Sequence, residues 1–295
     1  MVHVHGHIVD PSRSNRLIGA GPRSRGRVVA VSPSKILLST TSVYPEASTS
    51  AFELAASLGY DGVELMIGVD TLSTDIEAIA KLSEYHGVAV PSVHAPTLLL
   101  TQTTWGGDPW DRLRRSGEAA HRLGADTVVV HPPFRWQRDY GAGFVEGIRA
   151  LNREFRVTFA VENMFPWRTP AGNIPAYLPG WDPTGYDYDH LTLDLSHAAT
   201  SQRQSLDLIE AWGDRLAHVH FTDGRGSLKD EHLLPGEGNQ QAWQVLGELV
   251  RRNFHGHIVL EVSTRRARSR YEREELLRRC LEDIRACLRG EAVAR

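Results

Sequence analysis

Short apolar, β-branched runs alternate with segments of helical periodicity along the chain from residue 36 onward. Runs typical of buried strands occupy residues 36–40, 62–66, 88–94, 127–131, 157–162, 191–194, 216–221 and 257–261. Helical spacing of apolar residues predicts helices at residues 48–58, 74–85, 109–123, 143–155, 205–212, 240–252 and 271–288. A long connection rich in Pro, Gly and aromatic residues, 163–189, follows the fifth strand.

Regular strand–helix alternation predicts an α/β protein with a parallel sheet. Eight such units in one chain fit a single (β/α)₈ barrel, the TIM barrel. The alternative, an open doubly wound sheet, would carry a glycine-rich turn after its first strand. That turn reads STTSVYPE, residues 39–46, without glycine. Glycines that precede strands (Gly59, Gly87, Gly124 and Gly256) are predicted to end helices at the opposite face of the barrel.

Residues 1–33 lack this periodicity and are predicted to form a flexible N-terminal tail, with the barrel spanning 34–295. Five arginines in the tail partly offset the negative charge of the rest of the chain. Without the tail the chain has 28 basic and 35 acidic residues, a net charge of −7. An acidic body does not favour DNA as a partner, because DNA-binding proteins neutralise phosphates with basic side chains.

No apolar run is long enough to span a membrane, and the N-terminus lacks the apolar core of a signal peptide. We therefore expect a cytoplasmic protein with no membrane partner. The two cysteines, Cys280 and Cys287, lie seven residues apart on one predicted helix. That spacing separates them by two turns, so they are expected to be free thiols.

Side chains that can bind a metal stand at the ends of six consecutive predicted strands: His94, His131, Glu162, Asp194, His220 and Glu261. The chain just after the strands adds His197, Asp230 and His232. The ends of barrel strands open onto one face. One such residue is usually a hydrogen-bonded core residue, but several buried together require a compensating cation. Imidazole and carboxylate ligands suit Zn²⁺ or Mn²⁺ better than Ca²⁺.

The order of these nine residues, with Asp194-x-x-His197 and Asp230-x-His232, resembles the xylose-isomerase-like TIM-barrel superfamily over residues 36 to 290. That superfamily includes sugar phosphate isomerases and epimerases, and class II AP endonucleases of the endonuclease IV type. In the epimerase branch, the resemblance implies one metal on Glu162, Asp194, His220 and Glu261, with both glutamates moving protons. In the endonuclease branch, it implies three zinc ions on all nine positions. The expected cofactor is thus one to three Zn or Mn ions.

Three functions are compatible with such a site. The favoured one is a metal-dependent sugar or sugar-phosphate isomerase or epimerase, in which Glu162 and Glu261 move a proton through an ene-diolate. The first alternative is a zinc-dependent phosphodiester hydrolase resembling AP endonucleases. The acidic body and the short turn after the second strand, residues 67–72, argue against it. The second alternative is a metal-binding barrel without turnover.

Candidate substrate contacts come from the loops at the same face. Arg265 and Arg266 lie in STRRARSR, residues 263–270, after the eighth strand. Their guanidinium groups could grip the phosphate of a small anionic carbohydrate-like substrate. The same segment is equally typical of a solvated helix start. Trp136 and Trp167 are expected near the mouth, where aromatic rings stack on sugars or pack loops.

Overall fold

The computed structural model describes residues 1–3, 34–169 and 172–291. The chain divides into two compact units, Met1–Ser32 and Pro33–Arg295, and every element below belongs to the second. Most of the predicted tail, residues 4–33, lies outside the described residues, so its flexibility stays a prediction.

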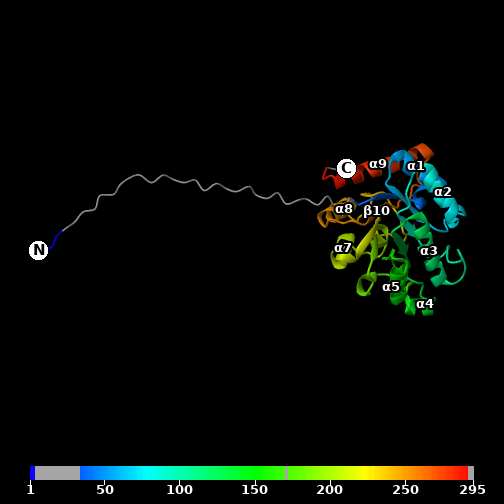
Figure 1. Ribbon diagram of the computed structural model, residues 1–295, viewed down its shortest axis with the longest axis horizontal. Helices are drawn as coiled ribbons and strands as arrows, with labels where there is room; N and C mark the ends of the chain where they lie inside the picture. Colours follow the sequence, from blue (N-terminus) through cyan, green and yellow to red (C-terminus); the bar gives the residue numbers. More distant parts are fainter. Residues whose placement is uncertain (4–33, 170–171, 292–295) are drawn as a thin grey trace. The chain divides into compact units, whose positions relative to one another are not determined.

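Eight parallel strands close into a barrel, which confirms the predicted TIM-barrel class (Figure 1). Their order around the barrel is β1-β10-β9-β8-β5-β4-β3-β2. The strands are β1 (Ile36–Ser39), β2 (Gly62–Met66), β3 (Ser92–His94), β4 (Thr127–Val130), β5 (Thr158–Glu162), β8 (Leu191–Asp194), β9 (Leu216–Phe221) and β10 (His257–Leu260). Consecutive barrel strands are always neighbours, so residues at successive strand ends lie beside one another.

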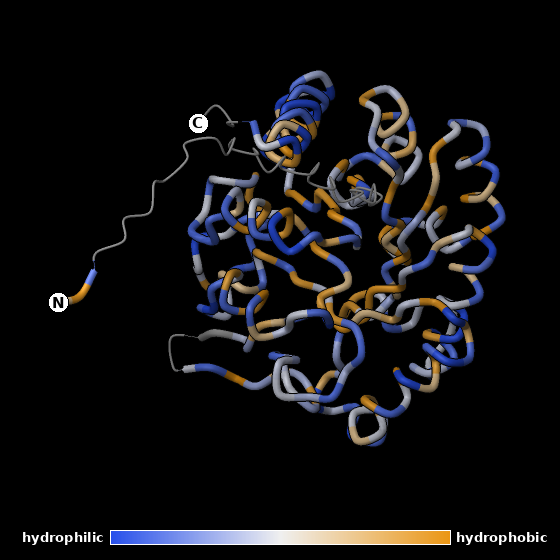
Figure 2. The backbone as a smooth tube through the Cα atoms, turned by 60° about the vertical axis from the view of Figure 1, so that its left-hand side comes forward, coloured by the Kyte–Doolittle hydropathy of each residue, from blue (hydrophilic) through white to orange (hydrophobic). Residues whose placement is uncertain are grey.

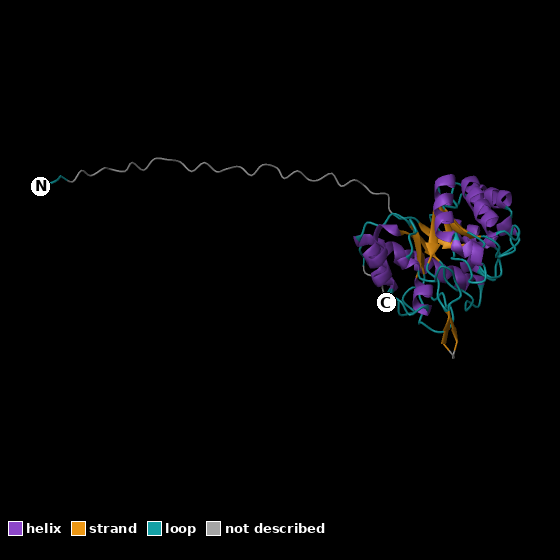
Figure 3. Cartoon of the chain, turned by 90° about the horizontal axis from the view of Figure 1, so that it is seen from below, coloured by secondary structure: helices purple, strands orange, loops and turns teal. Residues whose placement is uncertain are grey.

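Helices surround the strands, as Figure 3 shows. They are α1 (Ser48–Leu58), α2 (Ile76–His86), α3 (Pro109–Leu123), α4 (Arg138–Ala142), α5 (Phe144–Phe155), α6 (Leu195–Thr200), α7 (Ser205–Trp212), α8 (Ala242–Arg251) and α9 (Arg270–Leu288). None of the helices in the described part of the chain is long and apolar enough to cross a membrane. Cys280 and Cys287 on α9 are free thiols, as expected.

The strands are apolar because the helices cover one face and the barrel interior covers the other. The residues of β1, β4, β8 and β10 are all buried. In Figure 2 the hydrophobic colour follows the central strands, whereas the surrounding helices carry both colours. The polar residues on the strands are therefore exceptions that need partners inside the barrel.

Local signals explain most element boundaries. Asp75 and Asp108 cap α2 and α3 by accepting hydrogen bonds from backbone N–H groups of the first turn. Gly59, Gly87 and Gly124 end helices in the left-handed conformation, as predicted. The prediction for Gly256 is wrong, because α8 already ends at Arg251. A Cβ on Gly256 would lie 1.9 Å from the carbonyl oxygen of Ala217, so close backbone approach explains this glycine.

The main departures from the predicted elements lie near the loops. β3 begins at Ser92 and not at residue 88, because Pro91 has no N–H to donate to the ladder. The short helices α4 and α6 were not predicted. The long connection after β5 contains an antiparallel hairpin, β6 (Trp167–Thr169) and β7 (Gly172–Ile174), which projects from the barrel in Figure 3.

Candidate metal centre

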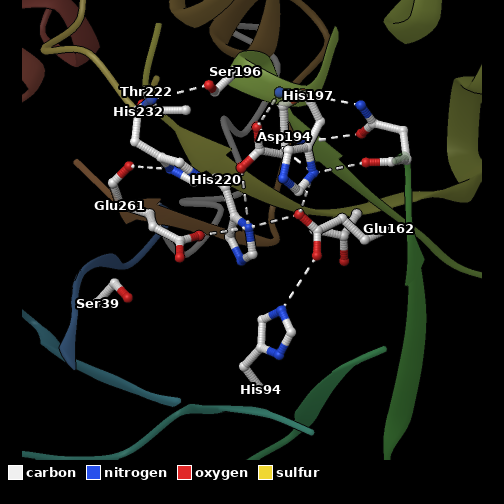
Figure 4. Close-up of polar contacts among 12 residues, drawn as sticks. Ser39, His94, Glu162, Asp194, Ser196, His197, His220, Thr222, His232 and Glu261 are labelled. Atoms are coloured by element: carbon white, nitrogen blue, oxygen red, sulfur yellow. Dashed lines mark hydrogen bonds and ion pairs between the residues drawn. The ribbon is translucent and has the colours of Figure 1, made fainter. Parts of the chain in front are cut away.

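Glu162, the last residue of β5, lies at the centre of a cluster of histidines (Figure 4). Its Oε2 lies 3.2 Å from Nε2 of His94 and 2.9 Å from Nε2 of His131. Its Oε1 lies 3.1 Å from Nδ1 of His197 and 3.2 Å from Nδ1 of His220. All five side chains are buried. One carboxylate thus links four histidines that come from four different parts of the barrel.

Three carboxylates converge on the same nitrogen of His220. Its Nδ1 lies 3.2 Å from Glu162, 3.5 Å from Asp194 and 2.9 Å from Glu261. Glu162 and Asp194 end β5 and β8, His220 is the penultimate residue of β9, and Glu261 directly follows β10. The closed strand order therefore brings them together. A single N–H can satisfy one of these acceptors well, but not three.

A third group joins α6 to the loop after β9. Oδ2 of Asp230 lies 3.2 Å from Nε2 of His197 and 2.8 Å from Nε2 of His232. Ser196 fixes this loop, because its hydroxyl donates to Oδ1 of Asp230 at 2.5 Å and accepts the backbone N–H of His232 at 3.0 Å. Contacts of 4.0 Å or less therefore connect all nine predicted ligands into one network.

Three carboxylates of the network, Glu162, Asp230 and Glu261, are held ionised. Burial raises the pKa of Glu162, but the attraction of His220, His131 and His197 outweighs it and holds the pKa well below its usual range. The same balance of burial against His232 and His197 lowers the pKa of Asp230. Without a metal, protons on the histidines supply the positive charge that these carboxylates need.

The histidines are correspondingly basic. Burial lowers the pKa of His197, yet Asp194, Asp230 and Glu162 raise it well above the ordinary value. His220 behaves in the same way beside several carboxylates. His131 differs, since burial outweighs Glu162 there and lowers the pKa. A divalent cation entering this network must displace protons from several of these imidazoles.

The donor set fits a transition-metal ion. Among the described residues, four groups of three side chains have donor atoms within 4.8 Å of one another: His94–His131–Glu162, Glu162–Asp194–His220, Asp194–His197–His232 and Glu64–His218–His220. Oδ2 of Asp194 is buried and lies 3.5 Å from Nδ1 of His220, but no group among the described residues is in hydrogen-bond geometry with it. A buried carboxylate oxygen without a donor is costly unless a cation faces it. Mixed imidazole and carboxylate donors are the ligands that Zn²⁺ and Mn²⁺ accept.

The network forms the base of a cavity of about 660 Å³. Seven predicted ligands line it: His94, His131, Glu162, His197, Asp230, His232 and Glu261. Thr41, Tyr44 and Arg265 line the same cavity, and Arg265 stacks 4.3 Å above the ring of Tyr44. A space of this size suits a small molecule.

Three predicted substrate contacts are not among the residues that line this cavity: Arg266, Trp136 and Trp167. Both arginines are exposed, but only Arg265 lines the cavity. Trp136 and Trp167 lie 5.9 Å apart and pack around Phe134, with which Trp136 is stacked at 4.7 Å. In the structure the two tryptophans pack against other loop residues.

One buried acid in the barrel was missed from the sequence. Glu64 lies within β2, fully buried, between Ser92, His218 and His220. The sequence of β9 does contain a signal for the cluster of Glu64, His218 and His220. His218 and His220 are two residues apart and therefore face the same side of the strand.

The fold and the site define the class of this protein: a TIM barrel with metal-capable side chains at the carboxyl ends of its strands, where such barrels carry their active sites. The profile of the family described as xylose isomerase-like TIM barrel matches residues 52–287, and the chain belongs to this family. An uncharacterized protein of Mycobacterium tuberculosis is 47% identical over 273 residues, which cover 86% of this chain and 98% of that protein.

Solved structures of low sequence identity share the fold. The 3-keto-D-glucoside 4-epimerase of Escherichia coli aligns with a TM-score of 0.62 at 17% identity, over 86% of this chain and 100% of that one. Endonuclease IV of Thermus thermophilus aligns with a TM-score of 0.53 at 22% identity, over 87% of this chain and 99% of that one. Both reaction classes considered from the sequence are therefore represented on this fold.

Proposed function

We propose that the protein is a divalent-metal-dependent isomerase or epimerase of a small anionic sugar, such as a sugar phosphate. One observation carries the proposal: Glu162 and Glu261 both line a cavity of about 660 Å³ whose base is the ligand network. A cavity of this volume fits a monosaccharide better than it fits a nucleic-acid duplex. The negative charge of the barrel also disfavours a polyanionic duplex.

The residues that would hold the metal in this reaction are Glu162, Asp194, His220 and Glu261. A bound divalent ion supplies Lewis-acid stabilisation of negative charge that develops on the oxygens of the sugar. The remaining chemistry belongs to the chain. One glutamate removes a proton beside the carbonyl, and the other returns a proton to the neighbouring position or opposite face.

Glu261 suits the role of a proton carrier. It lies at the cavity surface, and its Oε1 accepts a hydrogen bond from the hydroxyl of Thr41 at 3.2 Å. Burial raises its pKa, but His220 and His232 outweigh burial, so the pKa lies below the usual value. The carboxylate is therefore ionised and positioned to accept a proton at neutral pH.

Arg265 supplies the anion-binding part of the proposal. It lines the cavity that holds the carboxylates and packs on Tyr44, and no carboxylate among the described residues forms an ion pair with it. By contrast, Arg270 and Arg273 nearby are paired with Glu46. A guanidinium group in this position can bind a phosphate or carboxylate of the substrate.

The test is solvent exchange. The metal-loaded protein is incubated in D₂O with a panel of ketoses, aldoses and their phosphates, and deuterium incorporation is followed by NMR. We expect exchange at a carbon beside the carbonyl, abolished by Glu261→Gln and unchanged by Glu77→Gln. Glu77 is a suitable control because it lies on α2 in a surface ion pair with Arg122. Absence of exchange across the panel in wild-type protein would overturn the proposal.

A second function, phosphoester hydrolysis by clustered zinc ions, is favoured by the arrangement of the donors. Three of the four donor groups consist entirely of predicted ligands, and Glu162 belongs to two of them. Such clusters activate water and stabilise both oxygens of a displacement. Elemental analysis that finds three zinc ions per chain, with metal-dependent incision of an abasic-site duplex at low salt, would establish this alternative. Metal binding with neither activity would leave a barrel without turnover.

A further inference from the structure

A fully buried carboxylate lies one layer below the candidate metal centre. Glu64 is on β2, and its Oε2 accepts hydrogen bonds from the hydroxyl of Ser92 at 2.5 Å and from Nε2 of His218 at 2.8 Å. Its Oε1 lies 2.9 Å from Nε2 of His220. This last contact is a close ion pair, because neither atom has a partner in hydrogen-bond geometry among the described residues.

The strand geometry explains why one carboxylate contacts both histidines. His218 and His220 alternate with Ala217 and Val219 along β9, so both imidazoles point into the barrel, one layer apart. Glu64 in β2 faces them from the other side of the closed sheet. Its two oxygens therefore contact two layers, His218 in the deeper one and His220 at the mouth.

The two nitrogens of His220 have separate surroundings. Nε2 faces Glu64, whereas Nδ1 faces Glu162, Asp194 and Glu261. A carboxylate beside one imidazole nitrogen keeps the proton on that nitrogen and leaves the lone pair on the other. In the metal-free protein both nitrogens face carboxylates, and the imidazole carries a proton on each. A cation on the Nδ1 side would displace the proton there, and Glu64 would hold the remaining proton on Nε2.

We propose that Glu64 is a positioning residue, which holds the ring of His220 so that Nδ1 is presented to the metal. Ser92 and His218 hold Glu64 itself, and they fix the carboxylate from the side away from the centre. This inference rests on the proposed metal site but not on the reaction that the site catalyses. It assigns Glu64 no contact with substrate.

The first test measures zinc affinity by competition with a chelator, together with the zinc content at saturation. Loss of a carboxylate that orients a metal-bound histidine typically costs about 10–100-fold in affinity. We expect Glu64→Gln to weaken binding by that amount and to leave the number of ions at saturation unchanged. Ser92→Ala is the matched control, because it removes a contact to Oε2 but keeps Glu64 facing His220. Its affinity should fall much less.

Two results would overturn the inference. Unchanged affinity in Glu64→Gln would show that His220 needs no such support. Loss of one whole ion at saturation would make Glu64 a ligand, as the grouping of Glu64, His218 and His220 would allow. Failure of the sugar-exchange assay leaves both measurements valid, so it refutes the proposed reaction alone.

A second measurement uses wild-type protein and covers the case in which Glu64→Gln does not fold. Nitrogen-15 NMR of the zinc-loaded protein reports which nitrogen of each histidine carries a proton. We expect His220 to bind zinc through Nδ1 and to carry its proton on Nε2. The opposite tautomer, with Nε2 on zinc, would overturn the inference.

Discussion

Asp230 and His232 are two residues apart in the chain, and Oδ2 of the first lies 2.8 Å from Nε2 of the second. The pKa of His232 is lowered by burial but raised more strongly by Asp230, to about 10. A histidine with an unfolded pKa of about 6.5 therefore binds its proton more tightly in the folded protein. Its contribution to stability is complete below the unfolded pKa and is lost as the pH rises through about 10.

The metal-free protein should accordingly lose stability between neutral pH and about pH 10, where the pKa of His232 lies. Urea unfolding at a series of pH values measures this loss. His232→Gln should reduce the decline in that range. His86→Gln is the control, because that partly exposed histidine on α2 lies outside the network. An identical pH profile in His232→Gln and wild-type protein would refute the coupling.

Metal binding should release protons. The pKa values of His197 and His220 are both well above the ordinary value, so both imidazoles are protonated near neutral pH in the metal-free protein. Metal ligands must be deprotonated. Titration calorimetry in buffers of different ionisation enthalpy should show release of more than one proton per chain, and affinity should fall as the pH is lowered. A heat of binding that is independent of the buffer would contradict this expectation.

The sequence could place the nine candidate ligands at one face because of the barrel's geometry. Neighbouring parallel strands end at one face, so a residue such as His131 or Glu162 could be placed from its position at a strand end alone. Glu64 was missed because it lies in the middle of β2, where a strand-end argument does not apply. Its contact with His218 spans 154 residues, which no local pattern reveals.

Loops were less predictable, since their course depends on tertiary contacts. Asp194 illustrates a local signal that was overlooked: its carboxylate accepts the backbone N–H of His197 at 2.7 Å and so caps α6. Arg265 and Arg266 illustrate the opposite case. They are adjacent and identical in chemistry, yet only the first is among the residues that line the cavity. Arg265 packs on the ring of Tyr44. The sequence around the two arginines gives no indication of this contact.

Replacement of the central carboxylate should affect the whole network. Glu162→Gln removes a negative charge that contacts four histidines, so bound metal and activity should both fall. We expect metal affinity to fall at least 10-fold, because removing a residue that only supports a metal ligand already costs about that much. Glu77→Gln, on the surface of α2, is the matched control. Metal content equal to wild type in Glu162→Gln would exclude a central role for this carboxylate.

The two arginines after β10 permit a sharp test of substrate charge. Both arginines are exposed and only Arg265 lines the cavity, so Arg265→Ala and Arg266→Ala remove the same charge from adjacent positions. A charge-assisted bidentate contact is about twice as strong as a neutral hydrogen bond, and hydrogen bonds to charged groups contribute about 1.5–3 kcal/mol.

Loss of that contact should raise KM for an anionic sugar by about 10–100-fold, by the same energy scale. The change should be small for the uncharged sugar, because it lacks the group that Arg265 binds. Arg266→Ala should leave both values near those of wild type. Parallel initial-rate measurements on a sugar and its phosphate separate these cases. If Arg265→Ala raises KM equally for both substrates, the lost packing on Tyr44 explains the effect. If Arg265→Ala and Arg266→Ala raise KM equally, long-range attraction of the substrate explains it.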